Sequence, residues 1–438
     1  MNPPSHPSPA PPASGAPAPH PAPPSEGLLA HAGEVLRPAL DLYLDLHAHP
    51  ETSGQEERTA GRFARSLEAA GCAVTPRVGG HGVVGVLRNG DGPRVWLRAE
   101  LDALPVEERT GLPYAGRNGA MHACGHDLHM AAATGAAALL ARLADRWRGT
   151  LVVVGQPAEE TLSGAGAMLG DGLYDRFGRP DVVLAQHAAP LPAGTVAHAP
   201  ERVTMTAAGA VLDVLLHGRG GHVATPHLAV DPVVAAAHVV TRLQGVVARE
   251  TAPADQVTLT VGTLRAGTAA NVIPEEARLG IALRAANDAS LERALSAVRR
   301  VVLAESAAAG APHEPEVTVS SRSAALLCDP RRAASVRRAH SALLGAGRVL
   351  DWPGSMATED FPLFGDAGAP VHGLHGVPLV YWMLGVVGAR EWHRAMAGGA
   401  EAAPAPNHSP FFAPHVGSAL RPAIGALAAA AVDRFADG

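Results

Sequence analysis

The chain has 438 residues, of which 47% are hydrophobic, and its formal net charge is −6. This length exceeds one ordinary core and predicts two folded units, while the negative charge argues against nucleic acid or an anionic membrane as a partner. No uncharged apolar run reaches the roughly 18 residues that a membrane span needs. All 35 basic residues are arginine, which excludes chemistry that needs a Schiff-base or P-loop lysine. Three widely spaced cysteines favour metal or buried-thiol roles in the cytoplasm over a disulfide framework.

Residues 1–26 consist almost entirely of Pro, Ala, Ser, Gly and His. Such a segment cannot bury enough apolar area to fold, and it lacks the charged start and apolar middle of a signal peptide. We expect a disordered or polyproline-like tail, with a proline-motif ligand as the alternative.

Residues 27–205 alternate between helix and strand patterns. Apolar spacing predicts a helix over 28–47, and Ser53-Gly54-Gln55-Glu56 predicts a capping box for a second helix that ends at Gly71. A buried helix is predicted over 130–143. Strands are predicted at 83–87, 94–101, 150–154 and 181–185.

Three of these predicted strands end in chemically active side chains: Asp102, the pair Glu159-Glu160, and His187. Open α/β sheets place their chemistry at the carboxyl ends of the strands. The alternation of strands and helices therefore predicts a doubly wound α/β catalytic domain whose site lies along one edge of the sheet.

The pattern changes near residue 206. Four predicted strands with alternating burial and two helices, over 206–320, indicate an inserted α+β domain with a four-stranded antiparallel sheet. The catalytic domain is then discontinuous, formed by 27–205 and 321–438, with a core strand at 380–384, a loop-like segment at 389–410 and a closing helix at 416–435. This arrangement would let a ligand near residue 408 meet those near 124–187.

The segment Met121–His129 holds one thiol, one carboxylate and three imidazoles. Cys124 and His126 are two residues apart and can reach one point, and a thiolate and a neutral imidazole are ligands for zinc and similar metals. The following helix favours a thiolate at its N-terminus. A cysteine nucleophile paired with a histidine is the alternative, and it predicts activity that survives chelators. We expect His122, Asp127 and His129 to support the site.

Adjacent carboxylates on an extended backbone point to opposite sides, so one of Glu159 and Glu160 can bind a metal while the other faces the substrate as general base. Each of these features also has an ordinary structural interpretation. An adjacent Glu pair is usually part of a solvated loop. His187 could be a core histidine, and Asn407-His408-Ser409-Pro410 could be a surface turn. Their positions after predicted strands favour the functional interpretation of Glu159, Glu160 and His187.

Seven segments in one order resemble the hippurate hydrolase and auxin-conjugate amidohydrolase family, over roughly residues 28–435. This family is a branch of the dinuclear metallopeptidases of family 20, which also includes aminoacylases and carboxypeptidases. The segments are Arg98–Pro105, His122–Asp127, Gln156–Glu160, Gly218–His222, Asn271–Pro274, Thr358–Phe361 and Asn407–Pro410.

The resemblance implies two divalent metal ions per subunit, zinc, manganese, nickel or cobalt. Cys124 would bridge the two ions, with His126 and His187 completing one coordination set and Glu160 and His408 the other. The residues that match the metal ligands are Cys124, His126, Glu160, His187 and His408.

The resemblance also implies that the 206–320 domain is a lid through which two subunits form a homodimer. Glu159 matches the general base, and Asp102 matches the acidic residue that orients a metal-binding histidine. His222 matches a lid histidine that reaches across the dimer to the substrate carbonyl. Asn271 and Arg284 lie near the lid contacts to the substrate carboxylate.

The function that these features predict is metal-dependent hydrolysis of the amide bond of an N-acyl amino acid, such as a hippurate-like, N-acetyl or indole-acetyl conjugate. Two departures from the family pattern bear on the acyl pocket: Ala188-Ala189-Pro190 has small residues where the family carries a bulkier one, and the segment 389–406 is longer. The alternatives are a metallo-carboxypeptidase or dipeptidase of the same clan, and a non-catalytic homologue that binds a metal or ligand.

Overall fold

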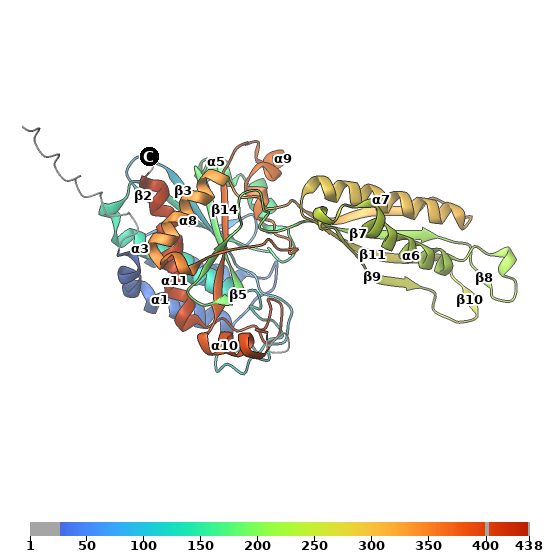
Figure 1. Cartoon of the computed structure of the whole chain (residues 1–438), viewed down its shortest axis with the longest axis horizontal. Helices are drawn as coiled ribbons and strands as arrows, with labels where there is room; N and C mark the ends of the chain where they lie inside the picture. The colour runs from blue at the N-terminus through green and yellow to red at the C-terminus, as the bar shows by residue number, and fades with distance from the viewer. Residues whose placement is uncertain (1–26, 399–402, 437–438) are drawn as a thin grey trace, which may run out of the picture.

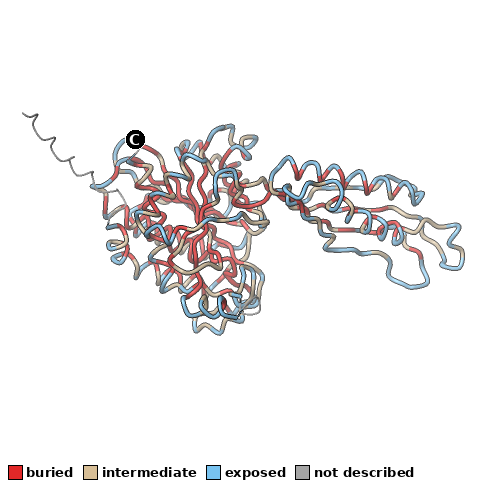
Figure 2. The backbone as a smooth tube through the Cα atoms, viewed as in Figure 1, coloured by how far each residue is buried: buried red, intermediate tan, exposed pale blue. Residues whose placement is uncertain are grey.

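The computed structural model describes residues 27–398 and 403–436, and the predicted tail 1–26 lies outside them. The chain forms a larger body and a smaller, elongated one that are joined by a narrow connection (Figure 1). Buried residues fill the centre of the larger body and follow the helix-facing side of the smaller one (Figure 2). Each body therefore has its own hydrophobic core, as the chain length predicts.

The larger body is built on a mixed eight-stranded sheet. Its four central strands, β4, β3, β5 and β14, run parallel to one another, while β1 and β2 add antiparallel strands at one edge. The strands in spatial order are β1 (Ala73–Val78), β2 (Gly82–Asn89), β4 (Gly149–Gln156), β3 (Arg94–Glu100), β5 (Val182–Pro192), β14 (Leu379–Val387), β6 (Val196–His198) and β13 (Val349–Asp351).

Helices cover both faces of this sheet, which confirms the predicted α/β class. Short helices α4 (Gly164–Gly170), α5 (Leu173–Phe177) and α9 (Ala369–His372) lie on the side of the core that contains Trp96 and Tyr381. The long helices on the other face are α1 (Leu28–Ala48), α2 (Glu57–Ala69), α3 (His126–Arg142), α8 (Pro330–Leu344) and α11 (Val416–Ala436).

Helix α3 packs closely between α1 and α11 because its inward residues are small. A Cβ at Gly135 would lie 2.6 Å from Ile424 Cδ1, so a larger residue there would force the Ile424 side chain to move. Among the described residues, α11 is the one helix long and apolar enough to cross a membrane, and 67% of its most apolar stretch is buried in the protein. It serves here as a core helix.

The smaller body is an antiparallel sheet with two helices on one face, which confirms the predicted inserted α+β fold. The sheet order is β12 (Glu316–Ser323), β7 (Ala208–His217), β11 (Glu276–Ala285) and β9 (Thr258–Ala266), and the helices are α6 (Pro232–Glu250) and α7 (Asp288–Ala308). A two-stranded ribbon, β8 (Gly221–His222) with β10 (Val272–Ile273), lies at its free end (Figure 1). The boundaries at 206 and 320 stay predictions, and β12 continues to Ser323.

Two local predictions are wrong. The expected capping box does not form, because Ser53 Oγ donates to Asp102 Oδ2 at 2.7 Å and Glu56, the residue before α2, makes no side-chain bond to the helix. The segment expected to be loop-like begins with helix α10 (Ala389–Gly398). Its first ten residues are mostly strong helix formers, and the prolines that suggested a loop start only at Pro404.

A buried histidine pair joins β6 to α8 and α11. His340 Nε2 donates to the Ala426 carbonyl at 3.0 Å, so its Nδ1 accepts from His198 Nε2, 2.9 Å away. Burial lowers the pKa of His340 to about 4 and, with the neighbouring His340, holds the pKa of His198 well below its ordinary value. Both imidazoles are therefore neutral in the native protein.

We predict that this pair makes the protein less stable in mild acid. Between pH 6.5 and about 4 the unfolded chain binds more protons than the native protein, so the free energy of unfolding falls as the pH falls. Between about pH 7 and about pH 5.5, the variant H198Q/H340Q should lose less free energy of unfolding than the wild type. The difference is up to about 1.4 kcal/mol per pH unit for each imidazole, and it is measured by thermal denaturation. The exposed His238→Gln should match the wild type, and an equally steep loss in the double variant would contradict the prediction.

Candidate metal centre

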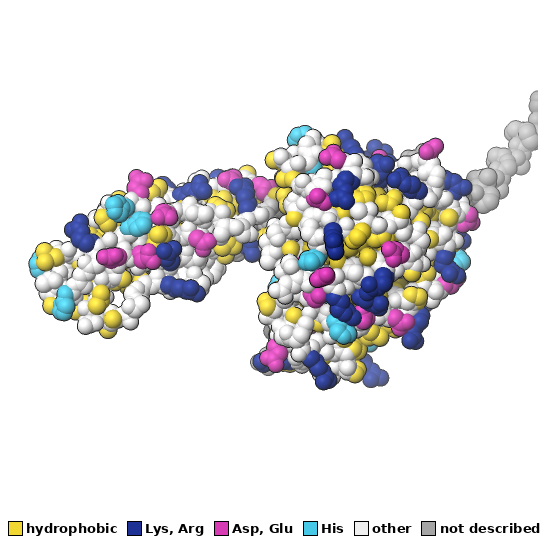
Figure 3. Space-filling view, turned by 180° about the vertical axis from the view of Figure 1, so that it is seen from behind, with side chains coloured by type: hydrophobic (Ala, Val, Ile, Leu, Met, Phe, Trp, Pro, Cys, Tyr) yellow, Lys and Arg dark blue, Asp and Glu magenta, His cyan; other side chains and the backbone are white. Residues whose placement is uncertain are grey.

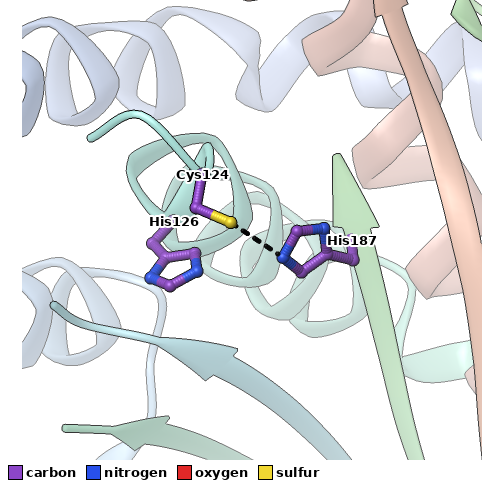
Figure 4. A group of neighbouring side chains, drawn as sticks. All are labelled: Cys124, His126 and His187. Carbon is purple, nitrogen blue, oxygen red and sulfur yellow. Dashed lines mark hydrogen bonds between the residues drawn. The ribbon is translucent and has the colours of Figure 1, made fainter. Parts of the chain in front are cut away.

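Cys124 lies between two histidines that come from distant parts of the chain. Its Sγ is 3.3 Å from His187 Nε2 on β5 and 3.4 Å from His408 Nε2, which precedes α11. Gly125, at φ +84°, turns the chain between Cys124 and His126, the first residue of α3. The thiol and the imidazoles of His126 and His187 face one another (Figure 4).

The predicted ligands form two groups that share Cys124. Cys124, His126 and His187 form one, and Cys124, Glu160 and His408 form the other; in each group the candidate ligand atoms lie within 4.8 Å of one another. Glu160 Oε2 is 3.4 Å from His408 Nε2, and Glu160 Oε1 is 3.9 Å from His126 Nε2. All five predicted ligands are thus brought together, two to each side of one thiol.

The free lone pairs of this cluster fit metal ions. His126 Nδ1 lies 2.9 Å from the Asp102 carbonyl and His187 Nδ1 lies 2.9 Å from the Ala188 carbonyl, so both Nδ1 atoms donate, and in the neutral rings both Nε2 atoms carry a lone pair. Among the described residues, the buried His126 Nε2 and Glu160 Oε1 have no hydrogen-bond partner. A sulfur, imidazole and carboxylate donor set is suited to zinc and neighbouring transition metals.

The electrostatics of the cluster also favour bound cations. Burial, together with the Glu160 carboxylate, raises the pKa of the Cys124 thiol to about 12. Burial, then the carboxylates of Glu359 and Glu160, raises the pKa of Glu159 well above its ordinary value. Divalent ions among these groups would stabilise the thiolate and the carboxylates together.

Glu159 and Glu160 lie in a turn, and the extended backbone predicted for them is wrong. Ala158 and Leu162 have left-handed φ angles of 47° and 55°, and Leu162 N donates to Glu159 O at 2.7 Å. The two carboxylates still face different neighbours, because Glu160 meets His408 while Glu159 lies near Glu359. One carboxylate can therefore bind a metal while the other acts as general base, as was expected. The turn, and not the alternation of side chains along a strand, separates them.

The sequence predicted His187 at the end of a strand, and this prediction is wrong. His187 lies inside β5. Strands β3 and β4 end at Glu100 and Gln156, but β5 continues to Pro192 because β14 pairs with it from Leu379 to Val387. The pairing of β5 with β14, which puts His187 opposite Met383, therefore fixes the position of His187. A fixed strand position holds a ligand more rigidly than a strand end does.

Supporting residues surround the ligands. Asp102 accepts from Ser53 Oγ and from Glu160 N, and its Oδ1 lies 3.3 Å from His126 Nδ1. His129 lies between Glu100 Oε2 (2.7 Å) and Ala188 N (2.8 Å), which uses both of its nitrogens and agrees with a supporting role. Buried His122 has no hydrogen-bond partner among the described residues.

Sequence reasoning assigned no role to two further groups. Asn407 Nδ2 donates to the Ala188 carbonyl at 3.0 Å and lies 3.7 Å from Cys124 Sγ. Buried Arg98 binds Glu100, Glu359 (2.8 Å) and Asp360 (3.0 Å) behind the centre. Both lie within segments quoted for the family resemblance, but only the tertiary structure shows their partners.

The centre opens into a cavity of about 700 Å³ between the two bodies. Arg284 of β11 lines it, as do Ala188-Ala189-Pro190, Trp352 and Met383. His222 and Asn271 are exposed on or beside the terminal ribbon of the smaller body, far from the centre of the same chain (Figure 1). Of the three predicted lid residues, the structure brings only Arg284 to the cavity.

Comparison with known proteins identifies the family. Peptidase family M20/M25/M40 matches residues 96–394. The N-acetyl-L-cysteine deacetylase of Bacillus subtilis is 34% identical over 352 residues, which cover 80% of this chain and 80% of that protein. The hippurate hydrolase of Campylobacter jejuni is 37% identical over 242 residues, 55% of this chain and 62% of that protein. A solved B. subtilis structure described as a dinuclear metal binding peptidase from the M20 family has a TM-score of 0.73 at 26% identity, covering 93% of this chain and 99% of that one.

The fold and the shared-thiol centre are those of a metallohydrolase, and the chain belongs to peptidase family M20/M25/M40. Its relatives include an N-acetyl-L-cysteine deacetylase and a hippurate hydrolase, and the family resemblance inferred from seven segments is confirmed. The matches cover from 54% to 80% of the curated relatives' own lengths.

We predict that Cys124→Ser weakens metal binding at both positions, because the Sγ atom is shared. The affinity measured by calorimetry should fall by at least the roughly 10- to 100-fold that loss of a supporting residue costs. Cys72→Ser is the matched control, since Cys72 is also buried but belongs to neither group. Equal metal affinity in the two variants would contradict the assignment.

Proposed function

We propose that the protein hydrolyses N-acyl amino acids to a carboxylic acid and a free amino acid, using two metal ions and Glu159. The observation that carries the proposal is the thiol of Cys124 shared by two donor groups, with Glu159 beside them at the wall of the cavity. The deacetylase and hippurate hydrolase relatives support this substrate class.

The chemistry divides between the ions and the chain. Two bound divalent ions would lower the pKa of a water from about 16 to about 7 and polarise the amide carbonyl. Glu159, whose carboxylate is 3.9 Å from His126 Nε2, takes the proton from the attacking water and returns it to the leaving amine. Asp102 holds the His126 ring in place.

The cavity has parts for both ends of such a substrate. Half-buried Arg284 carries the positive charge that a substrate carboxylate needs. Ala189, Trp352 and Met383 provide apolar surface for an acyl group, and the small side chains of Ala188 and Ala189 leave room there. A dipeptide would use the same groups, so peptides belong in the substrate screen.

We also propose that two copies of the chain form a dimer through the 206–320 domain. The ribbon that carries His222 and Asn271 exposes Val223, Leu228 and Val272, and hydrophobic and histidine side chains gather at this free end (Figure 3). A partner's cavity would cover this surface and receive the partner-facing His222 as a donor to the substrate carbonyl. We place the enzyme in the cytoplasm, in keeping with its three free cysteines.

We predict that Glu159→Gln keeps both metals but lowers kcat by about 10²- to 10⁴-fold, because the proton acceptor is lost. Hydrolysis is measured on N-acetyl, N-benzoyl and indole-acetyl amino acids and on dipeptides, with zinc, manganese, nickel or cobalt, and bound metal is measured by mass spectrometry. Exposed Glu107→Gln is the control. Full activity of E159Q, or activity of the wild type that survives chelators, would sink this assignment; the latter outcome would favour a cysteine nucleophile.

If two chains share each site in this way, two variants that are inactive alone should restore activity when they are mixed. H222A and E159Q should each be inactive alone, but a hybrid dimer has one cavity with an intact Glu159 and an intact His222 from the partner. Mixing equal amounts after reversible dissociation should restore about a quarter of the wild-type activity. If His222 served its own chain, the mixture would stay inactive.

A further inference from the structure

The segment Ser53–Glu56 lies against the turn that carries Glu159 and Glu160. Glu56 Oε1 accepts a hydrogen bond from Gly54 N at 2.9 Å and a second from Ala158 N at 2.8 Å, across 102 residues of sequence. The Glu56 side chain is fully buried. The proposed chemistry gives it no role, and its expected role as a helix cap is wrong.

Ala158 directly precedes Glu159, and its conformation sets the direction in which the two carboxylates leave β4. Its φ of 47° lies in the left-handed region that residues with a Cβ rarely adopt. Such a conformation persists only when surrounding contacts hold it. The bond from Ala158 N to Glu56 is a contact of this kind.

Two carboxylates hold the backbone of this turn, and a third holds the start of helix α4 just after it. Asp102 Oδ2 accepts from Glu160 N at 2.9 Å, Asp360 Oδ2 accepts from Ala165 N at 3.0 Å, and Glu56 holds the start of the turn. Asp102 and Asp360 also contact charged neighbours. Glu56 Oε2, in contrast, has no hydrogen-bond partner among the described residues, so the contacts of this side chain are its own loop and Ala158.

We propose that Glu56 is a positioning residue for the Glu159–Glu160 turn, acting through the hydrogen bond from Ala158 N. This inference rests on the proposed function of Glu159 and Glu160. The bond holds the turn so that Glu160 faces Cys124 and His408. A displacement of about 1 Å at such a site can cost about 100-fold in rate.

The test separates the hydrogen bond from the charge. Glu56→Gln removes the charge but can keep both bonds, because Oε1 alone makes them and the amide nitrogen would take the place of the unpartnered Oε2. Glu56→Asp keeps the charge but withdraws the oxygen from Ala158 N, and it serves if Glu56→Ala fails to fold. Glu51→Ala is the matched control, since the Glu51 carboxylate accepts from Arg58 N and Thr59 N of α2 and makes no contact with the turn.

Hydrogen exchange of the metal-free protein measures how well the backbone of the turn is held, and it needs no substrate. E56A and E56D should exchange faster over residues 157–163, whereas E56Q and E51A should match the wild type there. In the cobalt-loaded protein, the absorption of the Cys124 thiolate–cobalt pair should change in the same two variants. With a substrate, their kcat should fall about 100-fold while KM changes less than about threefold.

Unchanged exchange and absorption in E56A and E56D would overturn the proposal. So would a loss in E56Q as large as that in E56A, or an equal loss in E51A, because these results would point to charge or to general destabilisation. A wild type that binds cobalt but hydrolyses no substrate would overturn the proposed function alone, and exchange of the turn would still decide the role of Glu56.

Discussion

The candidate site of the larger body depends on the convergence of donors from four separate parts of the chain around the thiol of Cys124. His187 and His408 lie within 3.4 Å of that sulfur, and Glu160 reaches the same point from another turn. Buried lone pairs and carboxylates at this density are unfavourable unless cations bind among them. The fold therefore holds together a set of donors that bound divalent ions would stabilise.

Rigid surroundings hold these donors in place. The small residues of α3 let it pack deeply against α1 and α11, which fixes the start of the helix that carries Cys124 and His126. On the other side, His187 has a register position opposite Met383 in the sheet. The Glu159–Glu160 turn has no such regular structure, and the buried carboxylates of Glu56 and Asp102 accept hydrogen bonds from N–H groups of its backbone.

The predicted substrate-binding residues of the smaller body lie at its two opposite ends. Arg284, near the connection, lines the cavity of its own chain, while His222 and Asn271 lie at the opposite end of the smaller body. A narrow connection and a distant ribbon with exposed hydrophobic and histidine side chains suit the proposed site that another copy of the chain completes. This geometry explains why a single chain presents the metal donors together but leaves part of the proposed carbonyl and carboxylate contacts apart.

Much of this could be predicted from the sequence. The types of ligand, the α/β class and the inserted α+β fold follow from residue chemistry and from the periodicity of apolar residues, both of which are local properties. Helix and strand positions were found because burial of one face imposes a period of 3.6 or 2 along the chain. The resemblance predicted Cys124, His126, Glu160, His187 and His408 as metal ligands, and these residues do lie together in the structure.

The tertiary structure alone decided where several of these residues point. Ser53 and Glu56 match a capping pattern, yet Ser53 Oγ donates to the Asp102 carboxylate and the Glu56 carboxylate accepts from Ala158 N. Both partners lie far along the chain, so the local pattern does not show them. Strand β5 continues past His187 because a neighbouring strand from another part of the chain supplies its hydrogen bonds. The sequence by itself determined which atoms could bind metal; contacts between residues far apart in the chain determined their geometry, since no local pattern encodes such contacts.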